Sequence, residues 1–148
     1  MKRKYFKYLF EHDTSLHLID GVLELIKDYH KHGLTLVVAS SASMENINRV
    51  FDRFDLNRFF TAKLSGADLE KSKPHPEIFI KAAQAASQPK EHCIVIEDST
   101  NGIEAAHSAG IFCIAYNSFH SKDQDYSKAN TVVDDYKKIS YSIIKDWV

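Results

Sequence analysis

The fold is decided by residues 93–116, which read CIVIEDSTNGIEAAHSAGIFCIAY. Two short apolar runs, Cys93–Ile96 and Ile111–Tyr116, flank a segment with helical spacing that ends at Gly110. Continuous apolar runs of this length are typical of strands buried on both faces of a parallel sheet, and glycine commonly follows the last turn of a helix. The stretch therefore predicts a strand, a helix and a second strand, with two carboxylates directly after the first strand.

The same alternation of strands and helices runs through the rest of the chain. Parallel strands joined by helices predict an α/β fold, a three-layer α/β/α Rossmann-like arrangement around a mostly parallel sheet. Lys4–Glu11, which is aromatic and basic, is interpreted as a short helix. The other predicted strands are Leu34–Ala39, Phe59–Leu64 and Thr131–Val133, and the other predicted helices are Gly21–His32, a helix capped by Ser43, Glu77–Ala86, Asn101–Ala109 and Asp135–Trp147.

Composition narrows the class of protein. The chain has 148 residues, of which 44% are hydrophobic and 26% charged, and its formal charge is −1. This balance indicates a globular domain, and a charge this close to neutral gives no basic field for nucleic acid. No apolar stretch is long enough for a membrane span or a secretory signal. The two cysteines, Cys93 and Cys113, are interpreted as buried thiols of a reducing compartment, so we expect a cytoplasmic protein without a membrane partner.

Polar residues follow two of the predicted strands. Ser40 and Ser41 come after the run that ends at Ala39, where hydroxyl and backbone N–H groups at a helix start can bind phosphate. An ordinary helix cap is the simpler interpretation of these serines. Lys73 lies in a loop stiffened by Pro74 and Pro76, and a lysine held in this way can neutralise phosphate charge. Lys71 competes with it for this role.

Glu97 and Asp98 follow the strand that ends at Ile96. Mg²⁺ is commonly bound by one or two carboxylates together with phosphate oxygens of a substrate. A magnesium site is one interpretation of this pair, and simple capping of the next helix by Asp98 or Ser99 is the other.

The order of these residues is more specific than any one of them. Ser40, then Lys73-Pro74-His75-Pro76, then Glu97-Asp98-Ser99 resembles the haloacid dehalogenase (HAD) superfamily, in its β-phosphoglucomutase-like and phosphoglycolate-phosphatase-like branch. The resemblance extends from about Gly21 to Tyr116. Its matching stretches are GVLELIKDYHKHGLTLVVASSAS, FDLNRFF, KSKPHPEIFIKAAQ and CIVIEDSTNGIEAAHSAGIFCIAY.

The resemblance implies a role for each of these residues. Ser40, with Ser41 beside it, binds the transferring phosphoryl group, and Lys73 balances the charge on phosphate and nucleophile. Glu97 and Asp98 hold Mg²⁺. Ser40 and Lys73 are thus the catalytic candidates, and the implied substrate is a small phosphorylated metabolite.

The first motif of the family, Asp-x-Asp followed by Gly, Ser or Thr, is not matched. Its nearest equivalents are Asp13-Thr14-Ser15, Asp20-Gly21 and Asp134-Asp135, none of which follows a predicted strand. Lys4–Ile19 resembles the last helix of the family's cap and the linker after it. We therefore predict a cap remnant over residues 1–20 and a core over residues 21–148 that lacks its first strand and its nucleophile. A weak or incomplete Mg²⁺ site follows from this.

In the family the first strand lies between the strands that end at Ser40 and Glu97. Without it, these two strands could pair directly, exchange a strand with a second copy in a homodimer, or accept Tyr5–Phe10 as a substitute. Direct pairing and dimerisation are favoured about equally. Insertion is ranked last because Lys4 and Lys7 make the segment basic for a central strand.

Two functions from different classes follow. The first is a Mg²⁺-dependent HAD hydrolase or phosphotransferase, either a β-phosphoglucomutase or a sugar-phosphate phosphatase, and we expect negligible turnover by this chain, in which no nucleophile is matched. The second is an inactive phosphate-binding module or dimerising fragment. A response-regulator receiver domain is disfavoured, because there the acidic pair precedes the hydroxyl and the lysine, whereas here Ser40 comes first.

Overall fold

The computed structural model describes residues 5–8, 21–117 and 124–148. Its centre is a six-stranded sheet in the order β3-β2-β1-β4-β5-β6, and all the strand pairs are parallel. The α/β fold predicted from the sequence is confirmed. The strands are β1 (Tyr5–Tyr8), β2 (Thr35–Ser40), β3 (Ala62–Ser65), β4 (Cys93–Glu97), β5 (Phe112–Tyr116) and β6 (Thr131–Val133).

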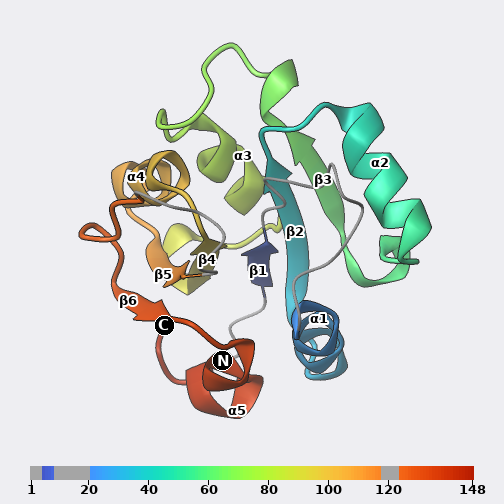
Figure 1. Cartoon of the computed structure of the whole chain (residues 1–148), viewed down its shortest axis with the longest axis vertical. Helices are drawn as coiled ribbons and strands as arrows, with labels where there is room; N and C mark the ends of the chain where they lie inside the picture. The colour runs from blue at the N-terminus through green and yellow to red at the C-terminus, as the bar shows by residue number, and fades with distance from the viewer. Residues whose placement is uncertain (1–4, 9–20, 118–123) are drawn as a thin grey trace.

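Helices cover both faces of this sheet (Figure 1). Side chains alternate along β2, so that Leu36 and Val38 face one layer while Val37 and Ala39 face the other. Because the sheet is buried on both faces, its strands read as continuous apolar runs. The helices are α1 (Val22–Lys31), α2 (Met44–Arg53), α3 (Glu77–Ala85), α4 (Thr100–Ala109) and the single turn α5 (Tyr141–Ile144).

The two helical layers have separate cores. In one layer, Ile26 and Phe51 from α1 and α2 pack with residues of β2, β4 and β5. In the other, Phe79 and Ile103 from α3 and α4 pack with Val37, Val95 and neighbouring residues. These layers bury both faces of the sheet, and the carboxyl ends of its parallel strands meet at one edge of the molecule. Among the described residues, no helix has the length and apolar character needed to cross a bilayer.

β1 occupies the central position of the sheet, between β2 and β4 (Figure 1). Tyr5 pairs with Thr35 on one side and with Cys93 on the other. Our ranking of insertion as the least favoured arrangement was therefore wrong, as was the short helix at Lys4–Glu11. The physical reason is that strand hydrogen bonds are made by the backbone, and leaving buried backbone groups unpaired costs about 1–3 kcal/mol each. The basic character that Lys4 and Lys7 give this segment does not prevent it from forming a central strand.

The predicted cap remnant over residues 1–20 otherwise falls on residues 1–4 and 9–20, which lie outside the described residues, and it stays a prediction. The predicted homodimer also stays a prediction.

The terminal helix predicted over Asp135–Trp147 is also wrong. The chain instead forms a short 3-10 helix at Tyr136–Ile139 and then the turn α5. Asp135 caps the first piece by accepting a bond from the N–H of Lys137, while Asp28 of α1 accepts one from the N–H of Tyr141 at 2.7 Å. These contacts with side chains stop the helix from continuing through Ser140, because they bind N–H groups at the start of each piece.

Candidate active site

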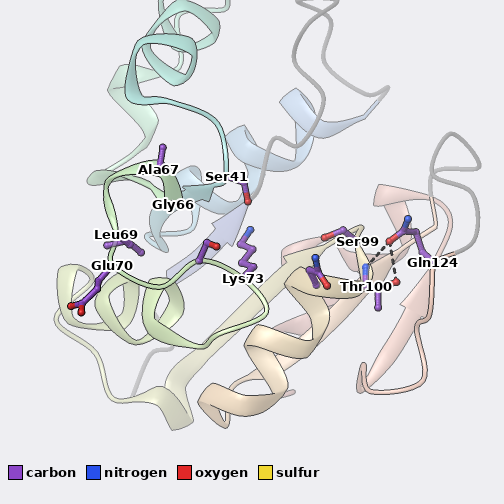
Figure 2. A pocket seen from close by; sticks show the side chains of 11 residues that line it. Ser41, Gly66, Ala67, Leu69, Glu70, Lys73, Ser99, Thr100 and Gln124 are labelled. Atoms are coloured by element: carbon purple, nitrogen blue, oxygen red, sulfur yellow. Dashed lines mark hydrogen bonds between the residues drawn. The ribbon is translucent and has the colours of Figure 1, made fainter.

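A cavity of about 780 Å³ opens beyond the carboxyl ends of β2, β3 and β4 (Figure 2). This is the edge at which open parallel sheets bind ligands. Among the described residues, most of its lining is polar and uncharged, with one lysine and one glutamate. The lining residues are Ser41, Gly66, Ala67, Leu69, Glu70, Ser72, Lys73, Ser99, Thr100, Asn101 and Gln124.

The two serines after β2 have different environments. Ser40 is fully buried, and its Oγ accepts a hydrogen bond of 3.0 Å from the N–H of Ala42. Ser41 is exposed and lines the cavity. Ser43 caps α2 by accepting a bond from the N–H of Asn46. Of the two predicted phosphate-binding serines, Ser41 therefore has its side chain on the cavity, while Ser40 supports the turn behind it.

Lys73 is the cation of the site. Its side chain is 4% exposed, and its Nζ lies 3.0 Å from Oε2 of Glu97 and 3.3 Å from the carbonyl oxygen of Ala39. Nζ also lies 5.2 Å from the centre of the Phe79 ring. The Lys73 side chain points between the loop that carries Ser41 and the start of α4 (Figure 2).

Lys73 and Ser40 meet at the same edge. Standard bond lengths keep a serine Oγ within about 5 Å of the preceding carbonyl oxygen, so Lys73 Nζ lies within about 9 Å of Ser40 Oγ. The sequence thus pointed to residues that the fold brings together, although their roles stay proposals.

Both carboxylate oxygens of Glu97 accept hydrogen bonds. Its Oε1 accepts bonds from the N–H of Asp98 at 3.0 Å and from the Oγ of Ser99 at 3.2 Å, and Oε2 accepts from Lys73. The carboxylate crosses the first turn of α4 at Gly102, where a Cβ would overlap the carboxyl carbon of Glu97. A glycine at position 102 is therefore needed for this arrangement.

The hydrogen bonds to Glu97 also affect the predicted Mg²⁺ site, because Glu97 is one of its two predicted ligands. Both oxygens of Glu97 already accept hydrogen bonds from Lys73, Asp98 and Ser99. Over residues 5–8, 21–117 and 124–148, no group of three or more acidic, histidine or cysteine side chains is arranged to hold a metal ion. Mg²⁺ requires near-octahedral oxygen coordination. The described residues alone therefore do not complete this coordination.

The buried thiols are not nucleophiles. Burial raises the pKa of Cys93 to about 12. Burial also raises the pKa of Cys113, with a further contribution from the charge of Glu97 and an opposing one from Lys73. Both side chains therefore stay protonated near neutral pH, and a thiol is a poor nucleophile compared with its thiolate.

Gln124 is a cavity residue that sequence reasoning missed. Its Oε1 accepts bonds from the N–H of Thr100 at 2.6 Å and from the Oγ of Thr100 at 3.0 Å. Asp125 then donates its N–H to the same hydroxyl at 2.7 Å. The loop before β6 is thereby fastened to the start of α4. Local sequence carries no signal for this contact, because 24 residues separate its partners.

The family can now be assigned. The model of the haloacid dehalogenase-like hydrolases matches residues 1–116, so the chain belongs to this family, whose members are typically Mg²⁺-dependent. The chain is 27% identical over 122 residues to the protein CbbY of Cereibacter sphaeroides, an alignment that covers 80% of this chain and 53% of CbbY.

Solved structures place the chain in the predicted branch. The crystal structure of CbbY from Rhodobacter sphaeroides in complex with phosphate gives a TM-score of 0.76 at 27% identity, covering 82% of this chain and 56% of that one. β-Phosphoglucomutase from Clostridium difficile gives 0.73 at 26% identity, covering 90% and 57%. The chain thus spans about half the length of these relatives.

Proposed function

We propose that the cavity binds the phosphoryl group of a small phosphorylated metabolite, and that the protein is a phosphatase or phosphomutase. The observation that carries this proposal is the position of Lys73, which is almost fully buried and is held by Glu97 in the wall of the cavity that Ser41 also lines. A cation fixed in a water-poor wall stabilises negative charge without reorganisation. The hydroxyl and amide groups around it suit a polar substrate.

Each described residue has a limited part in this proposal. Ser41 and the backbone of its turn bind phosphate oxygens, and Lys73 offsets their charge. Glu97 keeps Lys73 oriented and does not touch the substrate. Asp98 is the candidate for contact with a metal ion, which in this family would supply further charge stabilisation. We expect Mg²⁺ to bind only weakly to the free chain, and calorimetry showing micromolar affinity would contradict the incomplete donor set.

The position of β1 changes how the residues after it are interpreted. Tyr8 pairs with Val38 and Ile96, so β1 points its carboxyl end toward the same edge as β2 and β4. The sequence then reads Leu9-Phe10-Glu11-His12-Asp13. Asp13 therefore follows a strand, although residues 11–13 read Glu-His-Asp and not Asp-x-Asp.

Glu11 and Asp13 lie outside the described residues and are no part of the site above. From their order in the sequence, we propose that they stand in place of the family's first motif, with glutamate at the nucleophile position, and this proposal replaces the cap remnant predicted for the same residues. Carboxylate attack on phosphorus breaks the P–O bond to the alcohol, which takes a proton from the second acid. Water then hydrolyses the acyl phosphate. A carboxylate one methylene too long would be misplaced by about 1 Å, enough to cost on the order of a hundredfold in rate.

The substitution Glu11→Asp tests this proposal. We expect negligible hydrolysis of p-nitrophenyl phosphate by the wild-type chain and a gain of at least about tenfold in Glu11→Asp. The matched control is Glu11→Asp with Asp13→Asn, in which the gain should disappear. A folded Glu11→Asp variant with no gain would contradict the role of this segment. Unchanged phosphate binding in that variant would then favour the alternative, a phosphate-binding module without catalysis.

A further inference from the structure

Ser65 is a buried polar residue that the proposed function does not use. It ends β3, it is 3% exposed, and it pairs in register with Ser40 at the end of β2. Its Oγ donates a hydrogen bond of 2.6 Å to the carbonyl oxygen of Ala42 and accepts one of 3.2 Å from the N–H of Ala67. One hydroxyl therefore connects the loop after β2 with the loop after β3.

Ser40 and Ser65 together hold both peptide groups of Ala42. The N–H of Ala42 donates to Ser40 Oγ at 3.0 Å, and its carbonyl accepts from Ser65. Two buried hydroxyls, one from each neighbouring strand, thus clamp the residue next to Ser41. Because rotating either peptide group of Ala42 would break one of these bonds, the backbone that follows Ser41 is restrained before any ligand arrives.

The two loops also pack closely. At Gly66, a Cβ would lie 3.4 Å from the carbonyl oxygen of Ser40 and 3.4 Å from the Cα of Ser41. The loop that begins at Gly66 leads on to Lys73, so a shift of Ser65 would move the turn at Ser41 relative to the cation. A phosphate site needs both elements at fixed separation, since small displacements weaken all of its contacts together.

We propose that Ser65 is a positioning residue for phosphate, acting through the backbone of Ala42 and not by contact with the ligand. This inference rests on the proposed function. Because Ser65→Ala removes one hydrogen bond that restrains the backbone of the phosphate site, we expect this variant to bind phosphate about tenfold more weakly. Ser65→Thr retains a hydroxyl and should keep the affinity within about threefold of wild type.

The test uses the whole chain with inorganic orthophosphate, titrated by calorimetry, and amide hydrogen exchange of Ala42 without ligand. Ser43→Ala is the matched control: it removes the cap of α2 in the same loop but leaves both bonds to Ala42. We expect Ser65→Ala to weaken phosphate binding and speed exchange at Ala42. Ser65→Thr and Ser43→Ala should change neither by more than about threefold.

The outcomes separate the two claims. If wild type binds phosphate and Ser65→Ala binds it equally well, the inference about Ser65 is overturned while the proposed function stands. If wild type binds no phosphate, the proposed function is overturned. Exchange at Ala42 then decides the inference alone: faster exchange in Ser65→Ala supports a clamp on the turn, and unchanged exchange refutes it.

Discussion

The ion pair between Lys73 and Glu97 and the ion pair between Lys138 and Asp134 join similar groups in different surroundings. The first pair lies at the carboxyl edge of the sheet, with side chains 4% and 0% exposed and an N–O distance of 3.0 Å. The second lies near the C-terminus, with side chains 61% and 46% exposed and a distance of 2.7 Å. The shorter contact is the weaker one, because water and salt screen exposed charges and burial removes that screening.

The buried pair has a role other than stabilising the fold. Removing both charges from water is costly, so a buried pair is weak evidence for stability in itself. The Lys73–Glu97 pair is instead explained by the cavity that it borders. Its cost is offset by the hydrogen bonds that Glu97 accepts from Asp98 and Ser99.

The largest effect is expected from removing one partner of the buried pair. Glu97→Gln keeps the shape of the side chain and leaves the ammonium group of Lys73 buried without its counter-charge. We expect the free energy of unfolding to fall by about 3–5 kcal/mol, measured by urea denaturation. Asp134→Asn is the matched control on the exposed pair. Equal losses of stability in Glu97→Gln and Asp134→Asn would contradict the expected difference between the buried pair and the exposed pair.

Gly102→Ala should have the next largest effect. The new Cβ overlaps the Glu97 carboxylate, so either that side chain or α4 must move, at a cost of about 1–3 kcal/mol. In a Glu97→Ala background the same change should cost little, because the atoms it meets are gone. Ser108→Ala, an exposed site on α4, controls for the helix itself. If Gly102→Ala lowers the free energy of unfolding equally in the wild-type and Glu97→Ala backgrounds, the new Cβ does not clash with Glu97.

Replacing both buried charges separates stability from binding. A variant with Lys73→Met and Glu97→Leu keeps similar volumes and leaves no unpaired charge. We expect its free energy of unfolding to lie within about 1 kcal/mol of wild type or above it, while orthophosphate binding is lost. Retained phosphate binding would show that Lys73 is not the cation of the site.

The smallest effect is expected at the exposed pair, where Lys138→Ala should leave the unfolding midpoint unchanged. The hydrogen bond and charge of Lys138 lower the pKa of Asp134 from 3.8, and those of Asp134 raise the pKa of Lys138 from 10.5. The stability that Asp134 contributes to the fold is therefore present above the pKa of this group in the unfolded chain. It is lost as pH falls through the lower pKa of the folded state. The stability that Lys138 contributes is present below the pKa of this group in the unfolded chain. It is lost as pH rises through the higher pKa of the folded state. Screening makes both small, and a measurable loss of stability near neutral pH would contradict this.

Sequence reasoning was most successful where the signal is local. Glu97 and Lys73 were singled out because one follows an apolar strand, the other lies in a proline-stiffened loop, and their order along the chain resembles the HAD family; their roles stay proposals. β1 was missed because four residues with a lysine among them carry little strand signal, and the position is determined by pairing with Thr35 and Cys93 far along the chain. Gln124 was missed for the same reason. The broken terminal helix depends on Asp28, which periodicity cannot reveal.

A titration of the ¹⁵N-labelled chain with orthophosphate, followed by amide chemical shifts, tests the phosphate site at Lys73 and Glu97 most directly. We expect saturable shifts that cluster at residues 41–43, 66–73 and 98–102 and that are absent from the variant carrying Lys73→Met and Glu97→Leu. Saturable shifts confined to another surface, or none at all, would contradict a phosphate site at the edge where Lys73 and Glu97 meet.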